Sequence, residues 1–360
     1  MGGMKMARKA NKKIEHPKVI SAVEWYQVNR DFYKRLALKI ELIIKEILED
    51  CQISFHSVTS RSKDIESFAK KASKDKYSDP KTEILDLAGI RITAYVESDV
   101  NKICEVLERE FEIIQEHSVN KSAILKYNEV GYRSIHYIAK LDSKRMQFPE
   151  YRRLNAPFEI QVRTVLQHAW AEIEHDRNYK FEGAELPEHA QIKRRFALLA
   201  GQLELADREF DSIVKDIEVY SNQVTEDTKK GNFDIQIDSI SLMNYLMNKF
   251  NSALDHITAS LGYASKEIVQ ELLAFGITKI SDLDVLINKR NFVEIVKEEG
   301  GLFQTFTGAL RGLMIIEDAK KYFDESYQGA WVTKEGNPII ELAQQNGVTI
   351  EKLKELKVIA

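Results

Sequence analysis

Apolar residues recur along the first part of the chain in a helical rhythm and then in an alternating one. Between Ala22 and Asp50 they return every three or four positions, which predicts one long amphipathic helix or two shorter ones. From Ile53 the pattern indicates a short strand, a loop, and a lysine-rich helix that opens near Asp64 and ends before Pro80. A domain that mixes helices with strands is therefore expected.

Strict alternation of apolar and polar residues predicts further strands. It is clearest in "LAGIRITAYV" (87–96), in "GYRSIHYIAKL" (131–141) and in "FEIQVRT" (158–164), with a shorter strand near 111–114. A helix is expected over 100–110. Strands with interspersed helices predict an α/β (α+β) fold, in which a mixed sheet is flanked by helices.

The segment 158–163 raises a question about its second face. Phe158, Ile160 and Val162 supply an apolar face, while Glu159, Gln161 and Arg163 supply a face with an acid, an amide and a base. An ordinary half-buried strand with a solvated face explains this pattern. From this segment alone the ordinary strand is the favoured interpretation, and the rest of the chain has to decide whether the polar face has another role.

The C-terminal part of the chain reads as almost wholly helical. A helix is expected from Thr164, a break at "EGAELPEH" (182–189), a helix over 190–221 and a linker at "TKKGNFDIQ" (228–236). The predicted organisation is a basic N-terminal arm over residues 1–20, an α/β domain over 21–228 and an all-helical C-terminal domain over 229–360. Two stretches of the last domain, "ELLAFGITKISDL" and "ELAQQNGVTIEKL", are faintly alike.

Composition narrows the class of protein. Among 360 residues, 44% are hydrophobic and 30% charged, and the net charge of −4 excludes a polycationic protein, although residues 1–18 are basic. Two cysteines, Cys51 and Cys104, form no disulfide framework, so a reducing cytoplasm is expected. Because no apolar run approaches 18 residues, we predict neither export nor a membrane-spanning segment.

A basic cluster around the helix near Asp64 is the first candidate for chemistry. Ser67 and Lys71 lie four residues apart and share a helix face, with Arg61 and Lys63 just before the helix. Cations and a hydroxyl at a helix N-terminus suit a polyphosphate. A solvated basic helix is the plainer interpretation of the same residues.

Two acidic residues on neighbouring predicted strands are the second candidate. Asp86 stands just before the 87–96 strand, and Glu159 lies on the polar face of the last strand. Such a pair suits Mg²⁺, which takes one or two carboxylates and keeps other positions for water and phosphate. Arg91 offers a guanidinium that can stack on a base, and Tyr132 and His136 share a strand face. Packing roles for Tyr132 and His136 stay open.

Four motifs in order resemble the synthetase domain of the RelA/SpoT family. They are R-x-K-x3-S-x3-K (61–71), D-L-A-G-I-R (86–91), G-Y-R-S-I-H (131–136) and E-I-Q-V-R-T (159–164), followed by "HAWAEIEHD". The resemblance covers about residues 20–220. It implies a nucleotidyltransferase-like fold, and transfer of the β,γ-pyrophosphate of ATP to the ribose 3′-hydroxyl of GTP or GDP, giving (p)ppGpp. It also implies that the polar face of the 158–163 strand is the floor of the catalytic cleft.

The resemblance assigns roles residue by residue. Asp86 and Glu159 would be catalytic and bind Mg²⁺, with Glu159 placed to accept the proton of the attacking hydroxyl. The residues implied for ATP are Arg61, Lys63, Ser67, Lys71 and Arg91. The residues implied for the acceptor are Lys121, Tyr132, His136, Gln161 and Arg163.

One departure leaves the acceptor open. Many alarmone synthetases carry Asn before the Gly-Tyr pair, where this chain has Val130. The alternative is a toxin-like relative that pyrophosphorylates the 3′-CCA end of tRNA under restraint by the C-terminal domain, and a catalytically silent nucleotide sensor is a third reading. The helical domain is expected to be regulatory, binding a protein partner or its own synthetase domain, and a homo-oligomer is left open.

Overall fold

The computed structural model describes residues 16–120, 134–178, 187–250, 265–290, 305–329 and 331–359. Two compact units make up the chain, Met1–Val214 and Lys215–Ala360. The division falls inside one continuous helix, α8 (Pro187–Lys229). A division within a helix does not locate the end of a folding domain, so the boundary expected at 228/229 stays a prediction.

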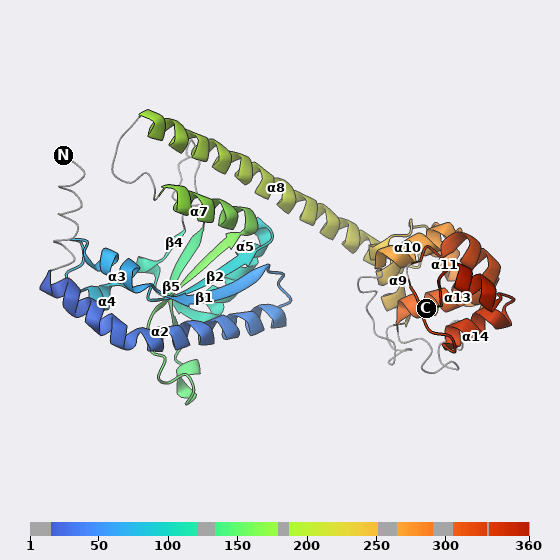
Figure 1. Cartoon of the computed structure of the whole chain (residues 1–360), viewed down its shortest axis with the longest axis horizontal. Coiled ribbons are helices and arrows are strands. Elements are labelled where there is room, and N and C mark those ends of the chain that lie inside the picture. The colour runs from blue at the N-terminus through green and yellow to red at the C-terminus, as the bar shows by residue number, and fades with distance from the viewer. Residues whose placement is uncertain are drawn as a thin grey trace. The chain divides into compact units, whose positions relative to one another are not determined.

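A mixed sheet forms the centre of the first unit (Figure 1), with strand order β1-β2-β6-β5-β3 and β4 paired to β5. β2 and β6 run parallel, and the other pairs are antiparallel. The strands are β1 (Ser57–Ser62), β2 (Ala88–Ala94), β3 (Phe111–Ile113), β4 (Val119–Asn120), β5 (Ile135–Leu141) and β6 (Phe158–Thr164). The predicted class, a mixed sheet flanked by helices, is confirmed.

Helices cover both faces of this sheet, with α2 along one face and α7 along the other (Figure 1). The α-helices of the first unit, besides α8, are α2 (Pro17–Asp50), α3 (Ile65–Ala72), α4 (Pro80–Glu83), α5 (Glu97–Glu110) and α7 (Val165–Asn178). Single 3-10 turns occupy Gln115–His117 and Arg145–Gln147.

Two local predictions need correction in extent. The first strand spans Ser57–Ser62, so it begins later than expected from the pattern that starts at Ile53, and it includes Arg61. The lysine-rich helix begins as predicted, because the Asp64 carboxylate accepts hydrogen bonds from the backbone N–H groups of Glu66 and Ser67. It ends at Ala72 and does not continue toward Pro80. The basic cluster therefore extends from Arg61 at the end of β1, through Lys63, onto a two-turn helix that carries Ser67 and Lys71.

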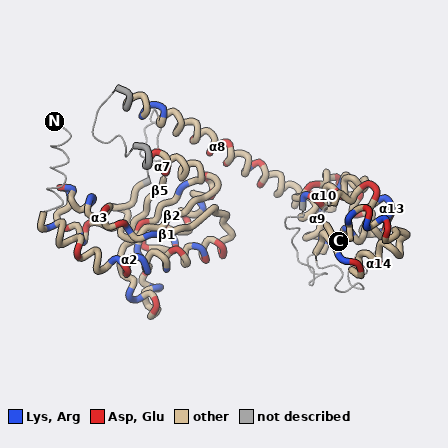
Figure 2. Tube along the Cα trace, in the orientation of Figure 1, with Lys and Arg blue, Asp and Glu red and all other residues tan. Residues whose placement is uncertain are grey.

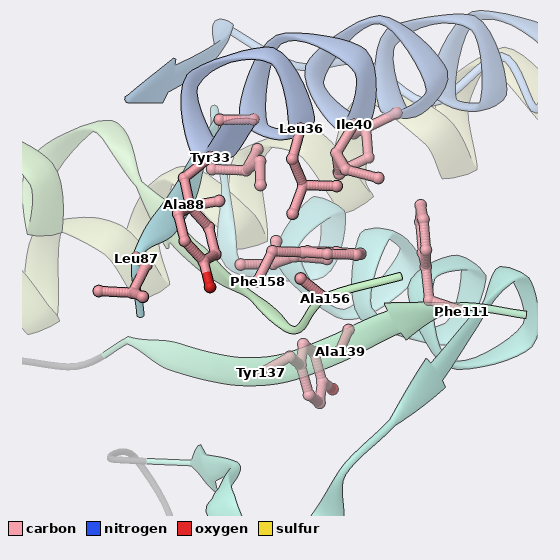
Figure 3. Close-up of a cluster of buried hydrophobic side chains, with 14 of the residues drawn as sticks. Tyr33, Leu36, Ile40, Leu87, Ala88, Phe111, Tyr137, Ala139, Ala156 and Phe158 are labelled. Carbon is pink, nitrogen blue, oxygen red and sulfur yellow. The ribbon is translucent and has the colours of Figure 1, made fainter. Parts of the chain in front are cut away.

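The core of the first unit lies between α2 and one face of the sheet (Figure 3). Phe158, Ile160 and Val162 of β6 are fully buried in it, together with Leu36 and Ile40 of α2. Buried residues of α5 belong to the same core. The apolar face of β6 thus packs in the core, and its polar face lies on the side of α7.

The second unit is helical. Its helices are α9 (Ser239–Phe250), α10 (Ser265–Ala274), α11 (Ile280–Lys289), α13 (Phe306–Lys321), α14 (Pro338–Gln345) and α15 (Ile350–Glu355), with a π-helical turn at Tyr322–Ser326. The two faintly similar stretches form α10–α11 and α14–α15. Each pair turns at a glycine with positive φ, Gly276 and Gly347, a conformation that side chains with a Cβ rarely adopt.

Part of the expected linker belongs to folded structure. α8 continues to Lys229, and Phe233 packs edge-on against Tyr245 with ring centroids 5.3 Å apart. The carbonyl of Ile235 accepts a hydrogen bond from the Ile280 N–H. Short polar segments without helical or strand periodicity look like linkers in a sequence, although tertiary contacts can still fix them.

A buried ion pair holds the second unit together. Arg311 donates three hydrogen bonds to the Glu271 carboxylate, at 2.6, 2.9 and 3.2 Å, and the Tyr322 hydroxyl donates a fourth at 2.8 Å. Glu271 is 1% exposed. Removing one partner of such a pair leaves an uncompensated buried charge, so the pair fixes how α10 and α13 meet.

No helix in the described part of the chain combines the length and apolar character needed to cross a membrane.

Replacing Phe158 by alanine should destabilise the first unit. Its ring is fully buried and packs edge-on against Phe111 at 5.7 Å, so truncation leaves a cavity and should cost about 3–5 kcal/mol. Urea unfolding of the full chain measures this. Phe148→Ala is the matched control, because Phe148 is 56% exposed and its loss should cost less than about 0.5 kcal/mol. Equal effects of the two substitutions would contradict the assigned core.

Candidate active site

The polar face of the sheet collects side chains from four neighbouring strands. In the strand register, Glu159 of β6 lies beside Gly89 of β2, which in turn pairs with Arg61 of β1. One row further along, Arg91 pairs with Gln161. Residues that pair directly across strands point to the same face. Arg61 and Arg91 therefore lie diagonally on the face that also carries Glu159.

Asp86 lies two residues before the start of β2 and contacts two lysines. Its Oδ2 accepts hydrogen bonds from Lys63 Nζ at 2.8 Å and from Lys71 Nζ at 2.7 Å. Burial alone would raise the pKa of Asp86, but the two ammonium groups outweigh burial and lower it. The sequence predicted that Lys63 and Lys71 act together on phosphates. In the structure both ammonium groups contact the Asp86 carboxylate.

Glu159 is held by its strand neighbours. One oxygen lies 2.9 Å from His136 Nδ1, and the other accepts a hydrogen bond from Gln161 Nε2 at 2.8 Å. Burial would raise the pKa of Glu159, yet the His136 contact lowers it overall, against an opposing effect of the Asp86 charge. Ser134 Oγ lies 2.6 Å from His136 Nε2 and so orients the ring. Glu159 is therefore kept ionised and fixed in direction.

Glu172 is a site residue that sequence reasoning missed. It comes from α7 and contacts Arg91 Nη1 at 2.9 Å and Arg163 Nη2 at 3.3 Å. Burial would raise the pKa of Glu172, and the two guanidinium groups lower it. Burial, together with the same arginines, lowers the pKa of His168 one turn earlier. The signal was present in "HAWAEIEHD", where His168 and Glu172 are four apart on a helix that starts directly after Arg163.

The donor atoms of the described residues fit a magnesium ion. Asp86 Oδ1 is buried and accepts no hydrogen bond. In the strand register Glu159 lies beside Gly89, three residues after Asp86, and the Asp86 charge acts to raise the pKa of Glu159. Among the residues that the structure describes, no group of three or more acidic, histidine or cysteine side chains gathers. Two carboxylates are enough for Mg²⁺, which draws its other ligands from water and phosphate.

The remaining predicted residues are less constrained. Arg61 and Ser67 are exposed, and the backbone N–H of Ser67 serves the α3 cap. Lys121 and Tyr132, with the neighbouring Val130, lie outside the described residues. The structure therefore brings together Lys63, Lys71 and Asp86, and separately His136, Gln161 and Glu159.

Known sequences give the family context. Residues 60–184 match the family model described as "Region found in RelA / SpoT proteins". This match over residues 60–184 confirms the resemblance that the four motifs carried.

Two curated relatives come from Bacillus subtilis (strain 168). GTP pyrophosphokinase YjbM is 28% identical over 148 residues, which cover 40% of this chain and 66% of the relative. GTP pyrophosphokinase YwaC is 34% identical over 100 residues, which cover 28% of this chain and 45% of the relative. The chain thus spans less than two thirds of the length of either relative.

Solved structures with similarity include small alarmone synthetase 1 from Bacillus subtilis, at 24% identity and a TM-score of 0.45, covering 54% of this chain and 98% of that one. A GTP pyrophosphokinase family protein from Streptococcus pneumoniae has 26% identity and a TM-score of 0.44, covering 55% and 96%.

Removing Lys71 should raise the pKa of Asp86. Because the pKa of Asp86 is lower in the folded state than its ordinary value of 3.8, the ionised carboxylate stabilises the fold at pH values above 3.8. This stabilisation is lost as the pH falls through the lower pKa of the folded state. In Lys71→Met only the Lys63 ammonium remains to counter the effect of burial on the pKa of Asp86. The stabilisation by the ionised carboxylate should therefore begin to be lost at a higher pH. Carboxyl ¹³C NMR titration of the full chain measures the shift. Lys74→Met, an exposed change on the same segment, should leave the pKa of Asp86 where it was.

Proposed function

We propose that this chain is an ATP-dependent pyrophosphotransferase that transfers the β,γ-pyrophosphate of ATP to the 3′-hydroxyl of GTP or GDP, giving (p)ppGpp. The observation that carries the proposal is the polar face of the sheet. It combines a carboxylate held by two lysines with a second carboxylate oriented by a histidine and a glutamine. That arrangement suits charged phosphates and one proton transfer.

The donor side would use the cations near β1 and α3. Lys63 and Lys71 neutralise Asp86 in the structure, and they are well placed to turn toward ATP phosphates, with Ser67 at the start of α3. Arg61 and Arg91 lie diagonally across β1 and β2, where they would take the adenine between two guanidinium planes. In this state Arg91 is held by Glu172, which ATP binding would have to release.

The chemical step would rest mainly on positioning and on charge neutralisation. The acceptor 3′-oxygen attacks the β-phosphorus, the bond from that phosphorus to the oxygen bridging the α- and β-phosphates breaks, and AMP leaves. Glu159 takes the proton of the attacking hydroxyl, because its lowered pKa keeps it ionised at neutral pH. Mg²⁺ held by Asp86 and Glu159 would neutralise charge on the transferred phosphates.

A guanine nucleotide is the favoured acceptor. Both curated relatives are named GTP pyrophosphokinases. These names favour a nucleotide over the 3′ end of tRNA. His136, Gln161, Arg163, Lys121 and Tyr132 would line the acceptor side.

Asp86→Asn and Glu159→Gln should each reduce pyrophosphate transfer to GTP at least about 100-fold, because each removes a charge at the reacting phosphates. Transfer is followed with γ-labelled ATP, and circular dichroism checks that both variants stay folded. Glu112→Gln is the control, since Glu112 is an exposed residue of β3 in the same sheet. Normal turnover by either active-site variant would contradict its assigned role.

The second unit is proposed to regulate this activity. Its helices form a core of their own, so a chain that ends at residue 230 should retain a folded first unit. We expect deletion of residues 231–360 to change the turnover number for GTP or the effect of expression on growth. Identical kinetics and growth for both chains would exclude a regulatory role.

A further inference from the structure

One carboxylate oxygen contacts both the donor and the acceptor side of the proposed site. Glu172 Oε1 lies 2.9 Å from Arg91 Nη1 and 3.3 Å from Arg163 Nη2. Under the proposed function Arg91 stacks on the adenine of ATP, and Arg163 lines the place of the acceptor nucleotide. A single side chain of α7 therefore holds one arginine from each side.

The strand register explains why the two arginines share a partner. β2 and β6 run parallel, and Arg91 pairs with Gln161. Two positions further along, Thr93 pairs with Arg163, so the two arginines are diagonal neighbours on the polar face. Burial would raise the pKa of Glu172, and the two guanidinium groups lower it. The carboxylate is therefore ionised and neutralises part of their charge.

The backbone of α7 is fixed near this contact. The Thr164 N–H donates to the Gln167 side chain at 3.1 Å, and the Gln167 N–H donates to Thr164 Oγ1 at 3.2 Å, which is a capping box. One turn later Trp170 Nε1 donates to the Phe196 carbonyl of α8 at 3.4 Å. Movement at Glu172 is thus expected in its side chain and not in the helix.

Exposure indicates which of the three charged side chains can move. The side chain of Arg163 is 3% exposed and that of Arg91 26%, whereas that of Glu172 is 56% exposed. An acceptor can reach the buried Arg163 only after a neighbouring side chain turns aside. A half-exposed carboxylate leaves an ion pair at little cost, because water replaces the lost contacts. Glu172 is therefore the side chain that either substrate would displace.

Displacement of one shared side chain couples the two substrates. Once adenine takes Arg91, Glu172 keeps only the longer contact to Arg163, which holds an exposed carboxylate weakly. The substrate that binds first bears the cost of moving Glu172, and the second substrate meets an arginine that is already released. Linkage makes the effect reciprocal, so each substrate raises the affinity for the other by the same factor.

We propose that Glu172 is a positioning residue that couples ATP binding to acceptor binding, by holding Arg91 and Arg163 until either substrate displaces it. The proposal rests on the proposed function, since it needs one arginine on each side of the reaction. It adds a property that the transfer chemistry does not require, namely positive cooperativity between the two substrates.

Calorimetric titration of the full chain in Mg²⁺ measures this coupling. The donor probe is α,β-methylene-ATP, in which a CH₂ group replaces the bridging oxygen of the bond that transfer would break, and the acceptor probe is GDP. For the native chain, saturating GDP should lower the dissociation constant of the ATP analogue at least about threefold, and the analogue should do the same for GDP. In Glu172→Gln the analogue alone should bind at least about threefold more tightly, and GDP should no longer change its affinity.

A matched control separates coupling from a general change in charge. Acidic residues recur along α8 (Figure 2), and Glu209 is an exposed one. Glu209→Gln removes the same charge as Glu172→Gln and should leave both affinities and their mutual effect as in the native chain. The mutual effect is the decisive readout, because a general gain in anion affinity would shift both dissociation constants without changing how they depend on each other.

The outcomes distinguish this inference from the proposed function. Binding of both nucleotides without any mutual effect, or a mutual effect that survives in Glu172→Gln, overturns the coupling and leaves the proposed function intact. Failure of the native chain to bind either nucleotide contradicts the proposed function and the coupling together. Circular dichroism of Glu172→Gln should match that of the native chain, because the substituted side chain is largely exposed.

Discussion

Strand β6 carries two incompatible surfaces at successive residues, and the rest of the first unit is arranged to satisfy both. Phe158, Ile160 and Val162 need a dry core, which α2 and α5 supply. Glu159, Gln161 and Arg163 need partners on the opposite face, because a buried charge without one costs several kcal/mol. His136 of β5 provides a partner for Glu159, Gln161 and Glu159 pair with each other, and Glu172 of α7 provides a partner for Arg163. The site is therefore a consequence of the same alternation that builds the core.

The electrostatic arrangement of this face explains how a buried site stays charged. Two lysines keep Asp86 ionised, and His136 does the same for Glu159, in each case against the effect of burial. Glu172 balances two arginines on the donor and acceptor sides. Four of the cations proposed to meet a substrate phosphate or base thus already have a carboxylate partner, namely Lys63, Lys71, Arg91 and Arg163. Substrate binding would exchange these partners, at a smaller cost than stripping water from bare charges.

The sequence pattern predicted which residues share a strand face and where the helix after β1 begins. The alternation in β2, β5 and β6 fixed which residues share a face, and the Asp64 cap fixed the start of α3. Glu172 was missed because its partners, Arg91 and Arg163, come from two different strands, and helical spacing alone does not reveal which strand a helix crosses. The end of α3 and the packing of Phe233 were missed because they depend on tertiary contacts. The roles of Lys121 and Tyr132 remain predictions.

The most direct test of this account is to incubate the full chain with γ-labelled ATP and Mg²⁺ and, in separate reactions, with GDP, GTP or deacylated tRNA, and then to separate the products. The account predicts labelled guanosine nucleotides and equimolar AMP, with no label on tRNA. Label on tRNA alone would contradict the proposed acceptor while retaining the transfer chemistry. No label on any acceptor, with the second unit present or deleted, would contradict the proposed activity itself.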